Sequence, residues 1–201
     1  MKEAAPKEVE NGVLAEVQKH FNYLYEQGES IYPFLPRHIK EVEKWAYFLL
    51  NTNPEADPEV VMISVWSHDF GHMFGGKDED HAVRSESEIR RVLSGTPFPQ
   101  EKIDQVAHCV RSHRRRDVEP SSLEARILAA ADSASHMTDI NYIVHLSEGM
   151  GEYVEGKVER DYRDISEFPE LREKLTPLYL AWKEVIKVYP NLEGSTPSAS
   201  L

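Results

Sequence analysis

The sequence predicts an all-α protein built as a single-domain helical bundle, and three observations support this fold class. Proline, glycine and capping residues divide the chain of 201 residues into segments of helical length. Within these segments, apolar residues recur at spacings of three and four, as on the buried face of an amphipathic helix. No period-two alternation is long enough to predict a sheet. A hydrophobic content of 40% is sufficient for one compact core.

Residues that favour helix starts and ends delimit the predicted helices. Asp57 and Pro58 are a cap and a first-turn proline, and they open an apolar segment that leads into His68 and Asp69. The predicted helices cover 9–27, 36–50, 58–66, 80–94, 99–114, a segment opened by 120–122 that carries Asp132, 136–163 with a weak point at Gly149 and Gly151, and 169–189 with a bend at Pro177. We expect residues 1–190 to form one domain and 191–201 to be a disordered tail, because the tail is rich in Ser, Pro and Gly.

The composition argues against several classes of protein. A formal net charge of −12 disfavours general nucleic-acid binding, which needs a broad basic surface. No apolar run approaches the roughly 18 residues that span a bilayer, and the first residues lack the apolar core of a secretory signal. The single cysteine, Cys109, precludes an internal disulfide and fits a reducing compartment. We therefore expect a cytoplasmic protein without a membrane or nucleic-acid partner.

Helical phase separates inward histidines from surface histidines. His38 and His113 both lie on apolar stripes, whereas His108 lies on the polar face of its helix. The stripes are His38 with Val42, Trp45 and Leu49, and His113 with Ile103, Val106 and Val110. A single inward histidine is more often a satisfied core residue than a metal ligand, so neither position decides the question alone.

Asp132 follows Leu128 by four residues and Ala125 by seven, so it lies along an apolar row. An ionised carboxylate there is costly unless it is paired with a cation, either an arginine or a metal. His81 has a consistent phase at the start of its helix. Several inward His and Asp residues on different helices would repel one another without a cation, and this convergence predicts a metal site. His72 and His136 fit outer positions around that site, or the surface, better than ligation.

The order of these histidines and aspartates along the chain resembles the signature of a known family. The ordered set His38, His68-Asp69 and Asp132 resembles the H…HD…D signature of the HD-domain metal-dependent phosphohydrolases, with an apolar helix before the pair and Phe70-Gly71 after it. The resemblance covers about residues 36–137. It implies an all-α bundle of the HD type in which these four residues hold a divalent metal. His81 and His113 resemble the extra histidines of the two-metal branch, in which Asp69 would bridge two ions.

The resemblance implies cleavage of a phosphoester or phosphoanhydride of a small molecule, with nucleotides favoured, by a metal-activated water. One or two ions of Mn, Fe, Co, Mg, Ni or Zn would serve. Besides Asp69, the candidate catalytic residues are Arg114 and Lys77 as phosphate binders and one acid of 78–80, with Asp78 the first of these, for proton transfer. Arg114 belongs to a basic run at 111–116 that could equally be a solvated helix end.

Two alternatives stay open. The same ligand set also occurs in di-iron oxygenases of this fold, and a non-catalytic sensor module could keep the metal for structure alone. Residues 142–189 are expected to shape the pocket, with Lys157 and Arg160 as candidate substrate contacts.

Overall fold

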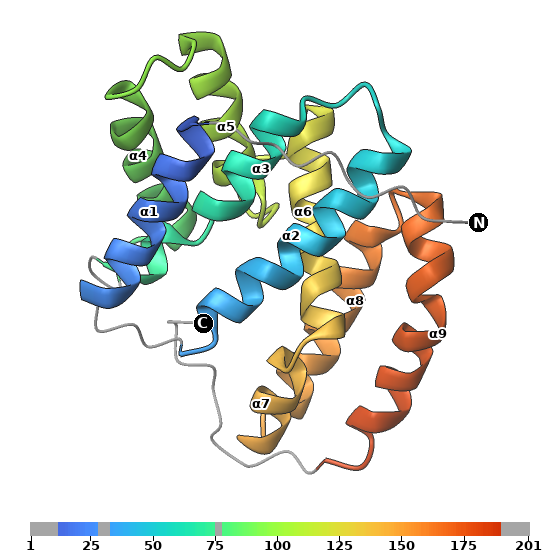
Figure 1. The fold of residues 1–201 in the computed structure, drawn as a ribbon. Helices are drawn as coiled ribbons and strands as arrows, with labels where there is room; N and C mark the ends of the chain where they lie inside the picture. Colours follow the sequence, from blue (N-terminus) through green and yellow to red (C-terminus); the bar gives the residue numbers. More distant parts are fainter. Residues whose placement is uncertain (1–11, 28–32, 75–77, 190–201) are drawn as a thin grey trace. The chain divides into compact units, whose positions relative to one another are not determined.

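The computed structural model describes residues 12–27, 33–74 and 78–189. Within these ranges the chain forms nine α-helices and one short 3₁₀ helix and contains no strand, which confirms the all-α fold class (Figure 1). The elements are α1 (Gly12–Gln27), α2 (Leu35–Thr52), α3 (Pro58–Ser67), η1 (Phe70–His72), α4 (His81–Ser94), α5 (Gln100–Ser112), α6 (Leu123–Thr138), α7 (Asn141–Ser147), α8 (Gly151–Ile165) and α9 (Pro169–Ile186).

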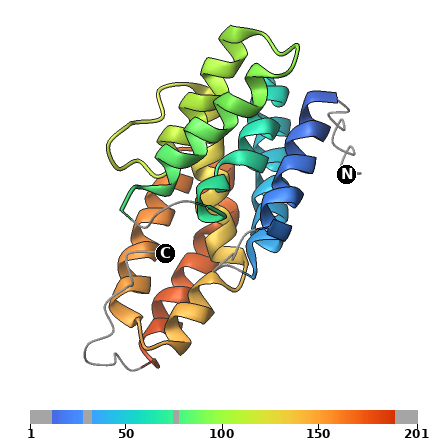
Figure 2. The ribbon, with the colours of Figure 1, turned by 90° about the vertical axis from the view of Figure 1, so that its left-hand side faces the viewer.

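The chain divides into two compact units, Met1–Ala129 and Ala130–Leu201, and the division falls inside α6. In the first unit, α3 contacts α1, α2 and α5, while α4 packs against α5 and η1. Figure 2 shows α4 and α5 side by side as a hairpin. Every residue of α3 from Val60 to Ser67 is buried, so this mostly apolar helix is enclosed around its whole circumference. The helix that leads into His68 and Asp69 is therefore the core of the first unit.

In the second unit, α8 packs against both α7 and α9, and Figure 1 shows α8 and α9 side by side. Tyr142 is fully buried, and its ring meets that of Trp182 edge-on at 5.1 Å between centroids. The indole N–H of Trp182 donates to the carbonyl of Met137 at 2.9 Å. These contacts fix α7 and α9 against the C-terminal turns of α6.

The predicted helix boundaries are mostly confirmed where capping residues set them. The side chain of Asp57 accepts hydrogen bonds from the backbone N–H groups of Glu59 and Val60, and Pro58 occupies the first turn of α3. Asp80 caps α4 by accepting from the N–H of Ala82 at 2.9 Å. Gly95 ends the same helix. Local side-chain chemistry was therefore enough to place these ends.

The prediction of one helix over 136–163 was wrong, although the weak point expected at Gly149 and Gly151 lies where α7 ends and α8 begins. Helix α6 continues to Thr138, a short α7 follows, and α8 begins at Gly151. Gly149 has a φ of 77°, a left-handed conformation that favours glycine and ends α7. The last helix ends at Ile186 rather than at residue 189. Residues 9–11, Gly28 and the predicted tail at 191–201 lie outside the described residues.

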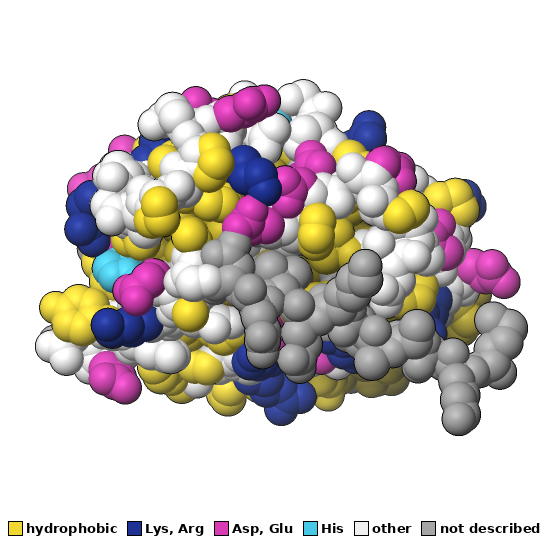
Figure 3. Space-filling model, turned by 45° about the horizontal axis from the view of Figure 1, so that its top comes forward, with side chains coloured by type: hydrophobic (Ala, Val, Ile, Leu, Met, Phe, Trp, Pro, Cys, Tyr) yellow, Lys and Arg dark blue, Asp and Glu magenta, His cyan; other side chains and the backbone are white. Residues whose placement is uncertain are grey.

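None of the described helices is both long and apolar enough to cross a bilayer. On the face drawn in Figure 3, acidic and basic side chains are interspersed, and the basic ones gather into no broad patch.

Candidate metal centre

The site is built around the end of α3, where the helix stops between two functional residues. His68 is the C-cap of α3, and its backbone N–H still bonds to the carbonyl of Ser64. The Nδ1 atom of its ring lies 2.8 Å from the carbonyl oxygen of Val65. Because a carbonyl only accepts, Nδ1 carries the proton, and the Nε2 lone pair is the atom that would bind a metal. Asp69, one residue later, has left the helix with φ −107° and ψ 14°.

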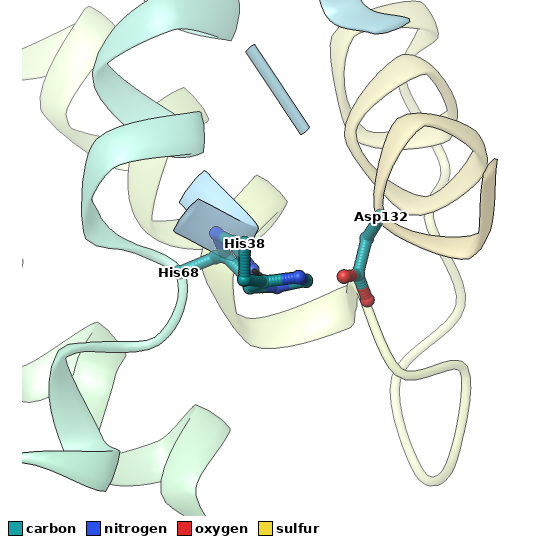
Figure 4. Close-up of side chains that lie close together, drawn as sticks. All are labelled: His38, His68 and Asp132. Carbon is teal, nitrogen blue, oxygen red and sulfur yellow. Dashed lines mark hydrogen bonds between the residues drawn. The ribbon is translucent and has the colours of Figure 1, made fainter. Parts of the chain in front are cut away.

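A first group of candidate ligands contains His38, His68 and Asp132. The Nε2 atoms of His38 and His68 lie 3.3 Å apart. Together with a carboxylate oxygen of Asp132 on α6, the donor atoms of this group all lie within 4.8 Å of one another. Figure 4 shows the two imidazoles next to each other and the carboxylate turned toward them. All three residues are among those that the sequence analysis assigned to the metal site.

A second group contains Asp69, His81 and His113, and all three residues are buried. The Nε2 atoms of His81 and His113 lie 3.3 Å apart. The Nδ1 atom of His113 lies 2.6 Å from the carbonyl of Val110, so this ring also offers its Nε2 lone pair to the centre of the group. Two helix ends thus present histidines in the same tautomer, each fixed by a carbonyl of its own helix.

Asp69 joins the two groups because its two carboxylate oxygens face different histidines. Oδ2 lies 3.4 Å from Nε2 of His38 and 3.5 Å from Nε2 of His68. Oδ1 lies 3.3 Å from Nε2 of His81 and 3.9 Å from Nε2 of His113. Although burial raises the pKa of Asp69, the surrounding histidines hold it well below its ordinary value. A bridging role for this carboxylate is therefore consistent with both its geometry and its charge.

The donor spacing fits divalent metal ions. Two atoms bound about 2.1 Å from one ion lie roughly 3.0–3.4 Å apart at octahedral or tetrahedral angles. The two histidine pairs, each at 3.3 Å, fall in this range. Neutral imidazoles with a carboxylate suit Zn, Mn, Fe, Co or Ni, so the residues present fit the ions that the sequence analysis named except Mg, which prefers oxygen ligands.

The turn after Asp69 is braced against the helix that carries His81. The N–H of Gly71 donates to Oγ of Ser85 at 2.8 Å, and the guanidinium of Arg84 donates to the carbonyl of Gly71 through Nε and Nη2. A Cβ atom on Gly71 would lie only 2.2 Å from the carbonyl oxygen of His81. The backbone of η1 therefore approaches the start of α4 so closely that it brings Asp69 and His81 together.

Of the two candidate phosphate binders, Arg114 is among the residues that the structure describes. The guanidinium of Arg114 lies 3.2 Å from Nδ1 of His81 and bonds to Asp80 at 2.7 Å. Arg116 bonds to the same carboxylate at 3.2 Å, so two cations share one anion next to the second group. Although burial raises the pKa of Asp80, the N–H of Ala82 and the charge of Arg114 lower it to about 2. Lys77 lies outside the described residues.

Asp78, the candidate for proton transfer, is exposed and precedes α4 by three residues. His108 lies away from both groups and bonds through Nε2 to the backbone N–H of Ser121 at 3.1 Å. This position agrees with its predicted place on the polar face.

His72 and His136, for which the sequence analysis left open an outer position around the site or the surface, both lie beside an aspartate of the site. The ring of His72 lies 3.8 Å from the ring of His81 between centroids, and its Nε2 is 3.7 Å from Oδ1 of Asp69. Burial lowers the pKa of His72 to about 3. His136 lies 3.4 Å from Oδ1 of Asp132. The spacings to the two aspartates, three residues for His72 and four for His136, were the signal that could have placed both.

Comparison with known proteins agrees with this geometry. The family described as HD domain matches residues 37–137, a range that contains all six candidate ligands. No curated protein and no solved structure matches the chain.

Proposed function

Since the chain belongs to the HD-domain family, we propose that it is a metal-dependent phosphohydrolase acting on a small molecule. It would cleave a phosphoester or phosphoanhydride bond, and nucleotides are the first substrate class to test. The observation that carries the proposal is that the two carboxylate oxygens of Asp69 face different histidine pairs. Oδ2 faces His38 and His68, and Oδ1 faces His81 and His113. A carboxylate shared by two histidine pairs would hold two ions close together, as two-metal hydrolytic sites do.

The chain's own residues would hold the metals and orient them. His68 and His113 each donate Nδ1–H to a carbonyl of their own helix, so their Nε2 atoms stay available without rearrangement. Bound divalent ions would supply Lewis acidity toward a phosphoryl oxygen and activate a water near neutral pH. The burial of Asp69, His81 and His113 would exclude bulk water from the second group.

Arg114 would contact the substrate phosphate beside the second group. Its guanidinium already lies next to His81, and it shares Asp80 with Arg116. Two guanidinium groups against one carboxylate leave an excess of positive charge, which favours a phosphate at this position. Asp80 is engaged by both arginines and by the first turn of α4. Asp78 and Glu79 are both exposed, and of these we propose Asp78 for proton transfer to or from solvent.

Phosphate release by the purified protein tests the proposal. The protein is incubated with Mn²⁺, Co²⁺ or Mg²⁺ and a panel of nucleotides and other phosphate esters, and metal content is measured in parallel. We expect metal-dependent phosphate release that falls at least about 100-fold in His113→Ala, because a metal ligand is lost. His108→Ala is the matched control on the same helix and should retain wild-type activity.

Absence of phosphate release with every metal, in protein that carries the bound ions, would overturn the proposal. Iron bound after anaerobic purification together with O₂ consumption would assign the chain to oxygenase chemistry instead.

A further inference from the structure

Helix α1 contacts the turn that follows Asp69, although α1 lies outside residues 37–137, the range that matches the HD-domain family. The buried face of α1 packs against α3, where the ring of Phe21 meets that of Trp66 edge-on at 5.5 Å between centroids. His20 precedes Phe21 in the chain and lies at the edge of this face, because its side chain is only partly buried. From there its ring contacts both α4 and η1.

The contact of His20 with α4 is a hydrogen bond to a carboxylate. Nε2 of His20 lies 2.7 Å from Oε1 of Glu88. Arg91 donates to both oxygens of Glu88, and these hydrogen bonds hold the pKa of Glu88 below its ordinary value. The carboxylate is therefore ionised and only accepts, so Nε2 of His20 is the donor. Glu88 lies three residues after Ser85, which accepts from the N–H of Gly71, so both side chains lie on the face of α4 that meets η1.

The contact of His20 with η1 is made through Phe70, the residue after Asp69. The side chain of Phe70 is fully buried, and the ring of His20 meets it edge-on, with 5.3 Å between centroids and 75° between the planes. Aromatic pairs favour this geometry. Because η1 is a single turn of 3₁₀ helix, whose own hydrogen bonds have poor geometry, neighbouring elements must fix where it lies. α4 holds it at Gly71, and α1 holds it at Phe70.

We propose that His20 is a positioning residue for the bridging carboxylate of Asp69. The hydrogen bond to Glu88 fixes the imidazole, and the imidazole fixes Phe70 and with it the backbone that carries Asp69. Because the two oxygens of Asp69 face different histidine pairs, a shift of this backbone weakens ion binding at both ligand groups. The N-terminal helix thus completes the metal centre. The inference rests on the metal-binding part of the proposed function and is independent of the substrate.

Metal binding by His20→Ala in the full chain tests the inference. Titration calorimetry with Mn²⁺ measures the affinity, and the visible absorption of the Co²⁺ form reports the geometry of the ligands. We expect a roughly 10-fold loss of affinity and an altered Co²⁺ spectrum, as when other groups that orient ligands are removed. Val17→Ala is the matched control, because it loosens the buried face of the same helix and keeps both contacts of His20. It should lower the unfolding temperature and leave affinity and spectrum unchanged.

Substitutions at Glu88 test the path through the hydrogen bond. Glu88→Ala leaves His20 without its acceptor and should reproduce the loss of affinity, whereas Glu88→Gln keeps an acceptor oxygen and should retain most of the affinity. Arg91→Ala removes the other partner of Glu88 and should bind metal as the wild-type protein does. The double variant His20→Ala/Glu88→Ala should bind metal no more weakly than His20→Ala, because both changes act through one contact.

Wild-type affinity and a wild-type Co²⁺ spectrum in His20→Ala would overturn the inference. A loss of affinity in Val17→Ala as large as that in His20→Ala would also overturn it, because loosening of α1 alone would then account for the effect. A wild-type protein that binds metal but releases no phosphate would instead refute the proposed hydrolase activity and leave this inference standing.

Discussion

Replacement of Gly71 by alanine tests whether the approach of η1 to α4 holds the second ligand group together. Among the described residues, Gly149 is the glycine with a positive φ, so the requirement at Gly71 is steric rather than conformational. The added Cβ would lie 2.2 Å from the carbonyl oxygen of His81, whereas such contacts need at least 3.0 Å. The two backbones must therefore separate by 3.0 − 2.2 = 0.8 Å.

A displacement of this size matters for both stability and metal binding. Overpacking of a closely packed site costs about 1–3 kcal/mol, and each kcal/mol lowers the unfolding temperature by roughly 2–4 °C in a chain of this length. Metal-ligand distances tolerate only about ±0.2 Å. Since Asp69 and His81 flank the contact, a 0.8 Å shift should also weaken binding at the second ligand group.

The assay compares Gly71→Ala with Gly95→Ala, a substitution at another helix end where the new Cβ meets its nearest atom at 3.5 Å. Thermal unfolding and the number of ions retained after dialysis are measured for both variants. We expect Gly71→Ala to unfold earlier and to lose ions from the second group, and Gly95→Ala to behave as wild type. Indistinguishable unfolding temperatures and ion counts for the two variants would refute the steric argument.

Three further predictions concern the scaffold. Asp57→Ala removes the cap of α3 and should cost about 1 kcal/mol of unfolding free energy by chemical denaturation, whereas Asp57→Asn should retain most of it. Burial alone would raise the pKa of Asp57. The hydrogen bonds from Lys102 and from the N–H of Val60 lower it by more than burial raises it, so the pKa in the folded state lies below 3.8. The difference in unfolding free energy between wild type and Asp57→Asn should therefore have its full size above pH 3.8 and vanish as the pH falls below that value. A difference that grew in acid would contradict this. Burial raises the pKa of Cys109 from 9.0 to about 12, which lowers its thiolate fraction about 1,000-fold at neutral pH, so a thiol reagent should react only as fast as the protein unfolds.

Helix ends and helix faces could be predicted from the sequence because both depend on residues a few positions apart. The cap of α3 at Asp57 and the inward phases of His38 and His113 are local patterns, and the structure contains them as expected. The break after Thr138 is not a local pattern, because no proline or glycine marks it before Gly149. Packing of Tyr142 against Trp182 is what orders α7 there, and that contact joins residues 40 positions apart in the chain.

Side-chain pairing across the chain was the part of the site that the sequence could not supply. Asp80 and Arg114 are 34 residues apart, and their ion pair follows from the hairpin of α4 and α5. The contact of Lys157 with His136 likewise depends on how α8 packs in the second unit. Residue type and helical phase identify which groups face inward, but tertiary packing decides which partner each inward group meets.

The end of α3 explains why a His-Asp dipeptide can serve two ligand groups. Adjacent residues within a helix point about 100° apart, so a continuing helix would turn Asp69 away from the direction of His68. Because the helix stops at His68, the ring stays anchored to the carbonyl of Val65 while Asp69 takes a non-helical conformation. Its carboxylate can then place one oxygen near His68 and the other near His81. The buried helix α3 fixes where that stop occurs, and the close approach of Gly71 to the start of α4 fixes which residues Asp69 meets there. The bridging position of the Asp69 carboxylate is thus set by the backbone packing of α3 and Gly71, and not by the ligand side chains.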